Sequence, residues 1–202
     1  MRQLTAEGSA LVRGAYLTAS LILVPGLGLA QDAVMSTRAL EAGAVEAAVY
    51  PVWLPGDGEL GGLARGAWRV EDAVQLRGHL GFFDDLAYFG ASAEIRVARV
   101  ESFAIAAVLG LHRSDFDAAA DILGFDASLL ARRDAAGLSF YASVDLDFER
   151  PEEPFDSFTR SHLVGGLSTK LSDRIQLVAE GGLGFNDSSP DYLSAGVALR
   201  FD

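Results

Sequence analysis

Residues 138–148 read Leu-Ser-Phe-Tyr-Ala-Ser-Val-Asp-Leu-Asp-Phe, with an apolar side chain at every second position. Successive side chains of a strand point to opposite faces, so a period of two predicts a strand with one apolar face and one polar face. A helix would need apolar residues three and four positions apart, and this stretch does not provide them. Residues 174–185 and 192–201 show the same alternation, so all three segments are predicted to be strands with one apolar face.

The alternation recurs along the chain from Ala39 onward. It predicts strands near residues 39–49, 62–70, 74–83, 87–98, 103–112, 123–132, 138–148, 160–171, 174–185 and 192–201. These are about ten strands, each of roughly the nine to eleven residues that a tilted strand needs to cross a bilayer. The first is weakly patterned, because Glu41 and Glu46 fall on opposite faces, and a short helix in a long loop is the alternative at 115–130. Eight strands is therefore the alternative count.

The connections between these strands form two groups. The short ones lie near 71–73, 99–102, 133–137 and 172–173, and the longer ones near 50–61, 113–122, 149–159 and 186–191. Short and long connections alternate, as in barrels whose short turns face the periplasm and whose longer loops face outward. The link at 84–86 is short where a long one is expected. An even number of strands places both ends of the barrel on the periplasmic side.

The first thirty residues are typical of an export signal. Arg2 and Arg13 precede an almost wholly apolar run at 14–29, and Gly28-Leu29-Ala30 has the small-x-small pattern of a signal-peptidase site. A retained anchor is the alternative, but this run is shorter than the about twenty residues that a spanning helix needs. The pattern predicts a signal peptide at 1–30, cleaved after Ala30, and a barrel at 31–202.

The composition excludes several functions. The formal net charge of −12 is unsuited to binding a nucleic-acid backbone, which requires clustered Lys and Arg. The chain has no cysteine, so it has no disulfide, thiolate metal site or thiol nucleophile.

Aromatic residues of the apolar face gather near the ends of the predicted strands. Phe82, Phe89, Phe125, Phe148 and Phe185 fall toward the outer end, and Trp68, Phe103, Phe140 and Phe201 toward the inner end. Two aromatic bands on either side of an aliphatic belt are typical of a lipid-facing barrel surface. A soluble barrel or sandwich, the alternative, would place these rings in its core.

The end of the chain, Tyr192-Leu-Ser-Ala-Gly-Val-Ala-Leu-Arg-Phe201, has apolar residues at every second position before a final aromatic residue. The positions concerned are Leu193, Ala195, Val197, Leu199 and Phe201. This segment resembles the C-terminal strand of bacterial outer-membrane β-barrel proteins, and residues 172–191 resemble the last hairpin of small porin-like barrels. The resemblance implies insertion into the outer membrane of a Gram-negative bacterium by the barrel-assembly machinery. Asp202, which follows the aromatic residue, departs from the pattern.

If the apolar face meets lipid, the polar face lines the lumen, because charged groups are costly in hydrocarbon. The predicted basic lining is Arg65, Arg69, Arg77, Arg96, Lys170, Arg174 and Arg200, and the acidic lining is Glu94, Asp145, Asp147 and Glu180. A basic wall would thus face an acidic wall. The two walls either meet in a salt-bridge network that fills the barrel or frame a narrow constriction. The filled lumen is preferred, since barrels of about eight strands are just filled by their own side chains.

The three histidines, His79, His112 and His162, come from separate predicted strands without paired spacing, so we expect no metal site. They also lack the motif of a known catalytic family.

We therefore expect an all-β, up-and-down transmembrane barrel that is not an enzyme and has no cofactor. Its expected role is envelope-structural or surface interaction, with outer-membrane lipid and the assembly machinery as partners. A narrow porin-like channel for ions or small solutes and a barrel-embedded hydrolase or acyltransferase are the alternatives.

Overall fold

The computed structural model describes residues 40–84, 86–116, 121–152 and 156–201. The predicted signal peptide at 1–30 and its cleavage site after Ala30 lie outside the described residues. Within the described ranges, no helix is long and apolar enough to cross a membrane.

The described residues form ten strands, which confirms the larger of the two predicted counts. They are β1 (Val45–Leu54), β2 (Glu59–Glu71), β3 (Val74–Phe83), β4 (Leu86–Val100), β5 (Phe103–Phe116), β6 (Ile122–Ala135), β7 (Leu138–Pro151), β8 (Phe158–Lys170), β9 (Ile175–Gly184) and β10 (Tyr192–Phe201).

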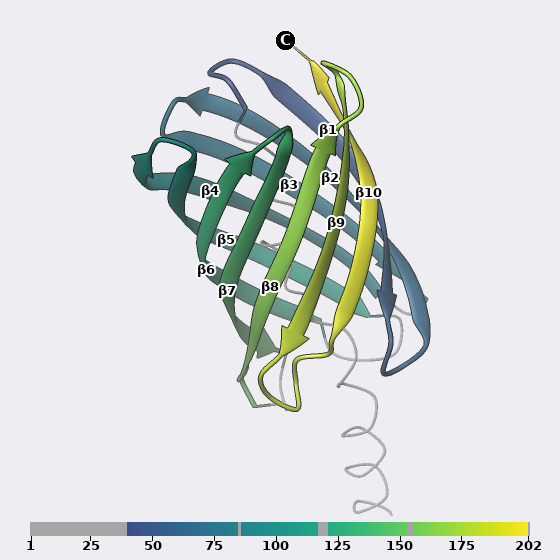
Figure 1. Cartoon of the computed structure of the whole chain (residues 1–202). Coiled ribbons are helices and arrows are strands. Elements are labelled where there is room, and N and C mark those ends of the chain that lie inside the picture. Colours follow the sequence, from purple (N-terminus) through teal and green to yellow (C-terminus); the bar gives the residue numbers. More distant parts are fainter. Residues whose placement is uncertain (1–39, 85, 117–120, 153–155, 202) are drawn as a thin grey trace, which may run out of the picture.

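The strands form a closed antiparallel barrel in which each strand pairs with its neighbours in sequence, and β1 pairs with β10 (Figure 1). The closing pair is registered from Val45 opposite Phe201 to Trp53 opposite Leu193. The start of β1 and the end of β10 therefore lie at the same end of the barrel, as an even strand count requires. Because the sheet closes on itself, no strand is left with an unpaired edge.

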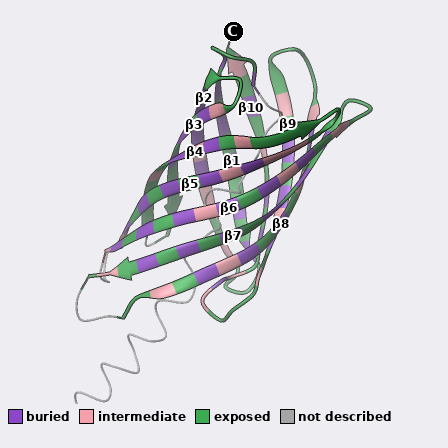
Figure 2. Cartoon of the chain, turned by 90° about the vertical axis from the view of Figure 1, so that its left-hand side faces the viewer, coloured by how far each residue is buried: buried purple, intermediate pink, exposed green. Residues whose placement is uncertain are grey.

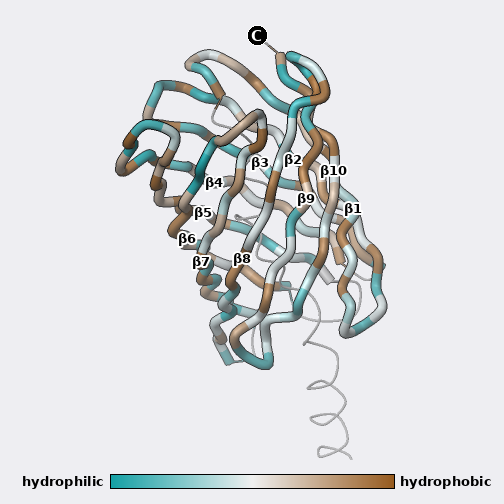
Figure 3. Tube along the Cα trace, viewed as in Figure 1, coloured by the Kyte–Doolittle hydropathy of each residue, from teal (hydrophilic) through white to brown (hydrophobic). Residues whose placement is uncertain are grey.

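Buried and exposed residues alternate along the strands (Figure 2). In β7 the pattern is unbroken from Leu138, which is exposed, to Glu149, which is buried. The buried set of this strand is polar and the exposed set is apolar, the reverse of a soluble protein, and Figure 3 shows the same close alternation of hydropathy along the chain. A barrel whose apolar side chains point outward and whose polar side chains point inward is suited to a hydrocarbon environment.

The first strand lies later in the chain than predicted. The expectation of a strand at 39–49 followed by a loop at 50–61 was wrong, since β1 runs to Leu54 and the loop covers 55–58. Pro51 misled the prediction, because proline has no N–H for a ladder and usually marks a loop. In the structure Pro51 pairs with Gly62 of β2, and the Ser194 hydroxyl of β10 donates to its carbonyl at 2.9 Å.

Of the region 115–130, for which a helix was the alternative, residues 115–116 and 122–130 are strand. β6 begins at Ile122 and pairs along its length with β5 and β7. The turn that follows β6 has two positive φ angles, 52° at Ala136 and 85° at Gly137, which is the backbone that a tight two-residue hairpin requires. Glycine takes such an angle at no steric cost, whereas Ala136 takes it with some strain.

Candidate functional site

The inner face of the barrel is lined with charged side chains, and most of them are buried. Arg69 and His162 are 0% exposed, and Glu94 is 2% exposed. Buried charges are stable only when they are paired or hydrogen-bonded, so the partners of these groups determine what the interior can do.

Glu94 of β4 is the centre of the largest ion-pair group. Its carboxylate pairs with Arg77 of β3, with Arg69 of β2 at 3.6 Å and with Arg132 of β6 at 3.6 Å. Arg77 sits on the strand next to β4, whereas Arg69 and Arg132 each reach across an intervening strand. We call these four residues the Glu94 cluster; they connect strands β2, β3, β4 and β6 through the interior.

Two further buried glutamates, on β1 and β9, are held by side chains of other strands. Glu46 of β1 pairs with Arg65 of β2 at 2.5 Å. Glu180 of β9 accepts hydrogen bonds from the phenols of Tyr141 at 2.6 Å and Tyr192 at 2.7 Å, which come from β7 and β10. Each contact joins different strands, so the interior is braced by side chains as well as by the closed backbone ladder.

Toward the loop end of the lumen, Glu149 of β7 and His112 of β5 form a second group. His112 Nε2 lies 3.2 Å from Glu149 and its Nδ1 lies 2.7 Å from Asp126, while Arg160 Nη1 donates to Glu149 at 3.0 Å. A Cβ built at Gly124 would collide with the His112 ring, so the close approach of that ring to β6 needs a glycine there.

The loop between β9 and β10, residues 185–191, packs against the outer end of β8. Arg160 Nε donates to the Ser188 carbonyl at 2.8 Å, the Ser161 N–H donates to Ser189 Oγ at 2.8 Å, and His162 Nε2 lies 3.2 Å from the Pro190 carbonyl. Because Arg160 and His162 are inward-facing, these bonds hold the loop at the mouth of the lumen.

The structure places the sequence-predicted lining residues in two groups. Arg65, Arg69, Arg77, Glu94, Asp145, Asp147 and Glu180 are buried on the inner face. Arg96 and Arg200 are half-buried, whereas Lys170 and Arg174 are exposed. The last two flank the turn from β8 to β9 and so lie at the rim rather than in the lumen, which corrects their predicted position.

Pairing within the lumen also differs from the two predicted walls. The arginines of β2 and β3 form ion pairs with Glu46 of β1 and Glu94 of β4, which lie on an adjacent strand or on the next strand but one. None of these ion pairs is with Asp145 or Asp147. Further buried charges were missed by the sequence analysis: Glu46, Asp126, Arg132, Glu149 and Arg160. Glu149 lies one residue beyond the predicted strand at 138–148, whereas the other four lie within predicted strands, where the alternation carried through those strands would have placed them on the inner face.

The aromatic residues predicted for the girdle are all exposed on the outer face, from 41% at Phe103 to 62% at Phe82. Phe125 and Phe148 lie side by side there, with ring centroids 6.2 Å apart. The three histidines lie in different surroundings, and within the described ranges no group of three or more His, Cys, Asp or Glu side chains could hold a metal ion.

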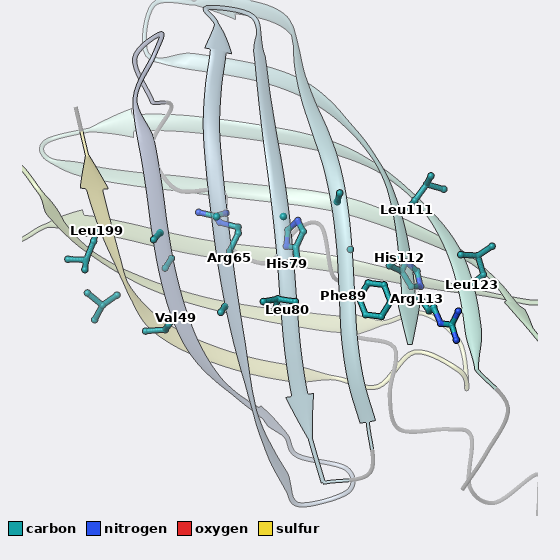
Figure 4. A pocket seen from close by; sticks show the side chains of 18 residues that line it. Val49, Arg65, His79, Leu80, Phe89, Leu111, His112, Arg113, Leu123 and Leu199 are labelled. Carbon is teal, nitrogen blue, oxygen red and sulfur yellow. The ribbon is translucent and has the colours of Figure 1, made fainter. Parts of the chain in front are cut away.

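The outer face also carries a hollow of about 930 Å³, lined by residues of β10 and of β1 to β6 (Figure 4). The cross-strand row Ala47, Gly66, Gly78 and Ala91 forms its floor. A Cβ built at Gly66 or Gly78 would meet no atom within 4 Å, so these glycines face open space. The hollow belongs to the apolar exterior rather than to the lumen.

Neither a protein-family model nor a curated protein sequence matches the chain. Among solved structures, an outer membrane channel from Pseudomonas putida F1 is similar, with a TM-score of 0.58 and 11% identity over 82% of this chain and 98% of that one. The KdgM porin has a TM-score of 0.49 and 10% identity over 78% of this chain and 99% of that one. The N-terminal β-barrel domain of Pseudomonas aeruginosa OprF has a TM-score of 0.39 and 14% identity over 80% of this chain and 100% of that one. The first of these similarities shows a shared fold.

Proposed function

We propose that this chain, which has the fold of bacterial outer-membrane β-barrel proteins, is a non-enzymatic barrel of the outer membrane with a lumen closed by its own side chains. In this proposal it supports the envelope or contacts a partner outside the cell through its loops. The observation that carries the proposal is the Glu94 cluster, whose ion pairs join four strands across the interior.

The apolar exterior supports a place in a membrane. Exposed Leu, Val, Ile, Phe and Trp side chains occur on all ten strands, for example Val49, Leu111 and Leu183, each about 60% exposed. Soluble monomers rarely expose apolar patches larger than a few hundred Å², because such patches drive association in water. A bilayer removes this penalty, which is why we place the barrel in the outer membrane after removal of the segment up to Ala30.

The last strand supports insertion by the barrel-assembly machinery. Leu193, Ala195, Val197, Leu199 and Phe201 all lie on the exposed face of β10. One edge of β10 pairs with β9, and the other edge closes the barrel by pairing with β1. The assembly machinery would therefore have to hold this strand until closure is complete. We propose that the machinery recognises the apolar face of β10 at that stage.

The absence of catalysis is part of the proposal. A hydrolase of this kind would need a histidine poised beside a nucleophile and oriented by a carboxylate. His112 instead lies between two carboxylates, those of Asp126 and Glu149, an arrangement that holds the ring in place.

Single-channel recording tests the closed lumen. The full-length chain would be expressed in a Gram-negative host, extracted from its outer membranes, checked for folding by heat-dependent gel mobility and added to a planar bilayer. We expect no steady openings. Regular openings whose size changes in Arg77→Ala or Asp145→Ala would overturn the closed lumen and place a constriction beside those residues.

A narrow channel for ions or small solutes is the second candidate. It is favoured by the similarity to the outer membrane channel from Pseudomonas putida, which covers most of both chains. The same recordings decide between the two candidates, because a channel conducts in the wild-type chain and a closed barrel does not.

A further inference from the structure

The outer half of the lumen contains more buried carboxylates than cations to balance them. The carboxylates, each 1% or 2% exposed, are Asp126, Asp145, Asp147 and Glu149. The groups that pair with them are Arg160 and the His112 ring, which is cationic when protonated. Arg160 pairs with Glu149, and His112 contacts Glu149 and Asp126. In the described part of the chain, no ion pair involves Asp145 or Asp147.

Two serine hydroxyls lie next to the Asp145 carboxylate. Ser128 lies directly opposite it on β6, and Ser143 lies two residues before it on the same face of β7. Both hydroxyls lie beside the Asp145 carboxylate. Even so, neither hydroxyl nor either carboxylate oxygen makes a well-aligned hydrogen bond to any described residue.

Burial makes this arrangement costly. Asp145 is 1% exposed, Ser143 is 3% exposed and Ser128 is 8% exposed. Buried polar atoms are almost always satisfied, and a buried charge without a counter-charge is strongly destabilising. Three side chains thus bring oxygen lone pairs together at a place where a positive charge would be stabilised.

Asp126 and Asp147 add to the negative charge. They are direct cross-strand partners, two residues after Asp145 on β7 and two residues before Ser128 on β6, and their carboxyl groups contact each other. Two carboxyl groups in contact are stable only when they share a proton or a positive charge lies nearby. Arg77, whose charge acts on Asp145 across the lumen, is already paired with Glu94.

We propose that the Asp145 carboxylate and the hydroxyls of Ser128 and Ser143 bind one hard cation of the alkali or alkaline-earth class, while Asp126 and Asp147 lie beside the site and do not ligate the ion. Carboxylate and hydroxyl oxygens are the donors that such ions prefer, and water completes their coordination. The ion offsets the excess carboxylate charge of this half of the lumen. The site requires a folded barrel, and it holds for a closed lumen as well as for a conducting one.

Cation-dependent unfolding tests the site. The full-length chain, extracted from outer membranes into detergent and dialysed into choline chloride, would be unfolded in urea in choline, sodium, potassium, magnesium and calcium chlorides of equal ionic strength. A ligand that binds the folded state lowers the unfolding equilibrium constant by the factor 1 + [L]/Kd, so about 100-fold at 100 times Kd. We expect at least one of the four metal ions to produce such a decrease relative to choline.

Asp145→Asn should abolish this dependence and be more stable than the wild type in choline chloride, because a buried charge has been removed. Asp156→Asn, which changes an exposed carboxylate, is the matched control and should keep the full response. Ser128→Ala keeps the Asp145 charge and should weaken the response to the metal ion. This variant tests the site even if Asp145→Asn fails to fold. Equal stability of the wild type in all five salts would overturn the proposal, as would a full response in both Asp145→Asn and Ser128→Ala.

Discussion

Replacing Glu94 with glutamine should destabilise the barrel strongly. The change removes one negative charge from the Glu94 cluster and keeps the shape of the side chain. Arg69, Arg77 and Arg132 then remain in the interior at 0%, 4% and 5% exposure without their shared carboxylate. Breaking a buried ion pair by removing one partner costs about 3–5 kcal/mol. Because three guanidinium groups depend on this carboxylate, we expect a loss within that range, which is roughly two to four orders of magnitude in the unfolding equilibrium constant.

Urea-dependent folding into lipid vesicles, followed by tryptophan fluorescence, measures this loss. Both tryptophans, Trp53 and Trp68, lie exposed on the outer face and report the transfer from lipid to water. Glu152→Gln is the control, because Glu152 is exposed beyond the end of β7 and its neutralisation should change the free energy of unfolding by less than about 0.5 kcal/mol. If Glu94→Gln unfolds within about 0.5 kcal/mol of the wild type, the three arginines do not depend on Glu94 and the reasoning is refuted.

Gly124→Leu should destabilise the barrel by about 1–3 kcal/mol, because the leucine side chain would enter the space of the His112 ring. Gly78→Leu, on the outer face, should be close to neutral. Vesicle refolding of the two variants side by side checks this contrast, and equal stabilities would contradict it. Tyr192→Phe removes a 2.7 Å hydrogen bond to the buried Glu180 carboxylate and should cost about 1.5–3 kcal/mol in the same assay, and a variant as stable as the wild type would show that the phenol does not support Glu180.

Much of this architecture could be predicted from alternation alone. Along β7, a period of two assigns each residue to the inner or outer face before any partner strand is known, and Asp145 and Phe148 both lie where that pattern places them. Errors arose where the pattern was locally weak. Residues 50–61 were predicted to be a loop, although Pro51 lies within β1, where the pairing to β2 holds it.

The rim positions of Lys170 and Arg174 show another limit. Their alternation assigned them to the polar face, but height along the barrel is set by where each turn falls, and both residues flank the turn from β8 to β9. The face of a residue therefore follows from the alternation, whereas its height along the barrel does not.

The sequence by itself determined the class of the fold and the face of most residues and limited the strand count to eight or ten, because these depend on local periodicity, which a strand imposes on its own side chains. Only the tertiary structure decided which charges meet. Arg132 is 38 positions after Glu94 in the chain, yet closure and register bring the two within 3.6 Å. Contacts of that kind depend on the stagger between strands and on the reach of each side chain across the lumen, neither of which is encoded in the period of any one strand.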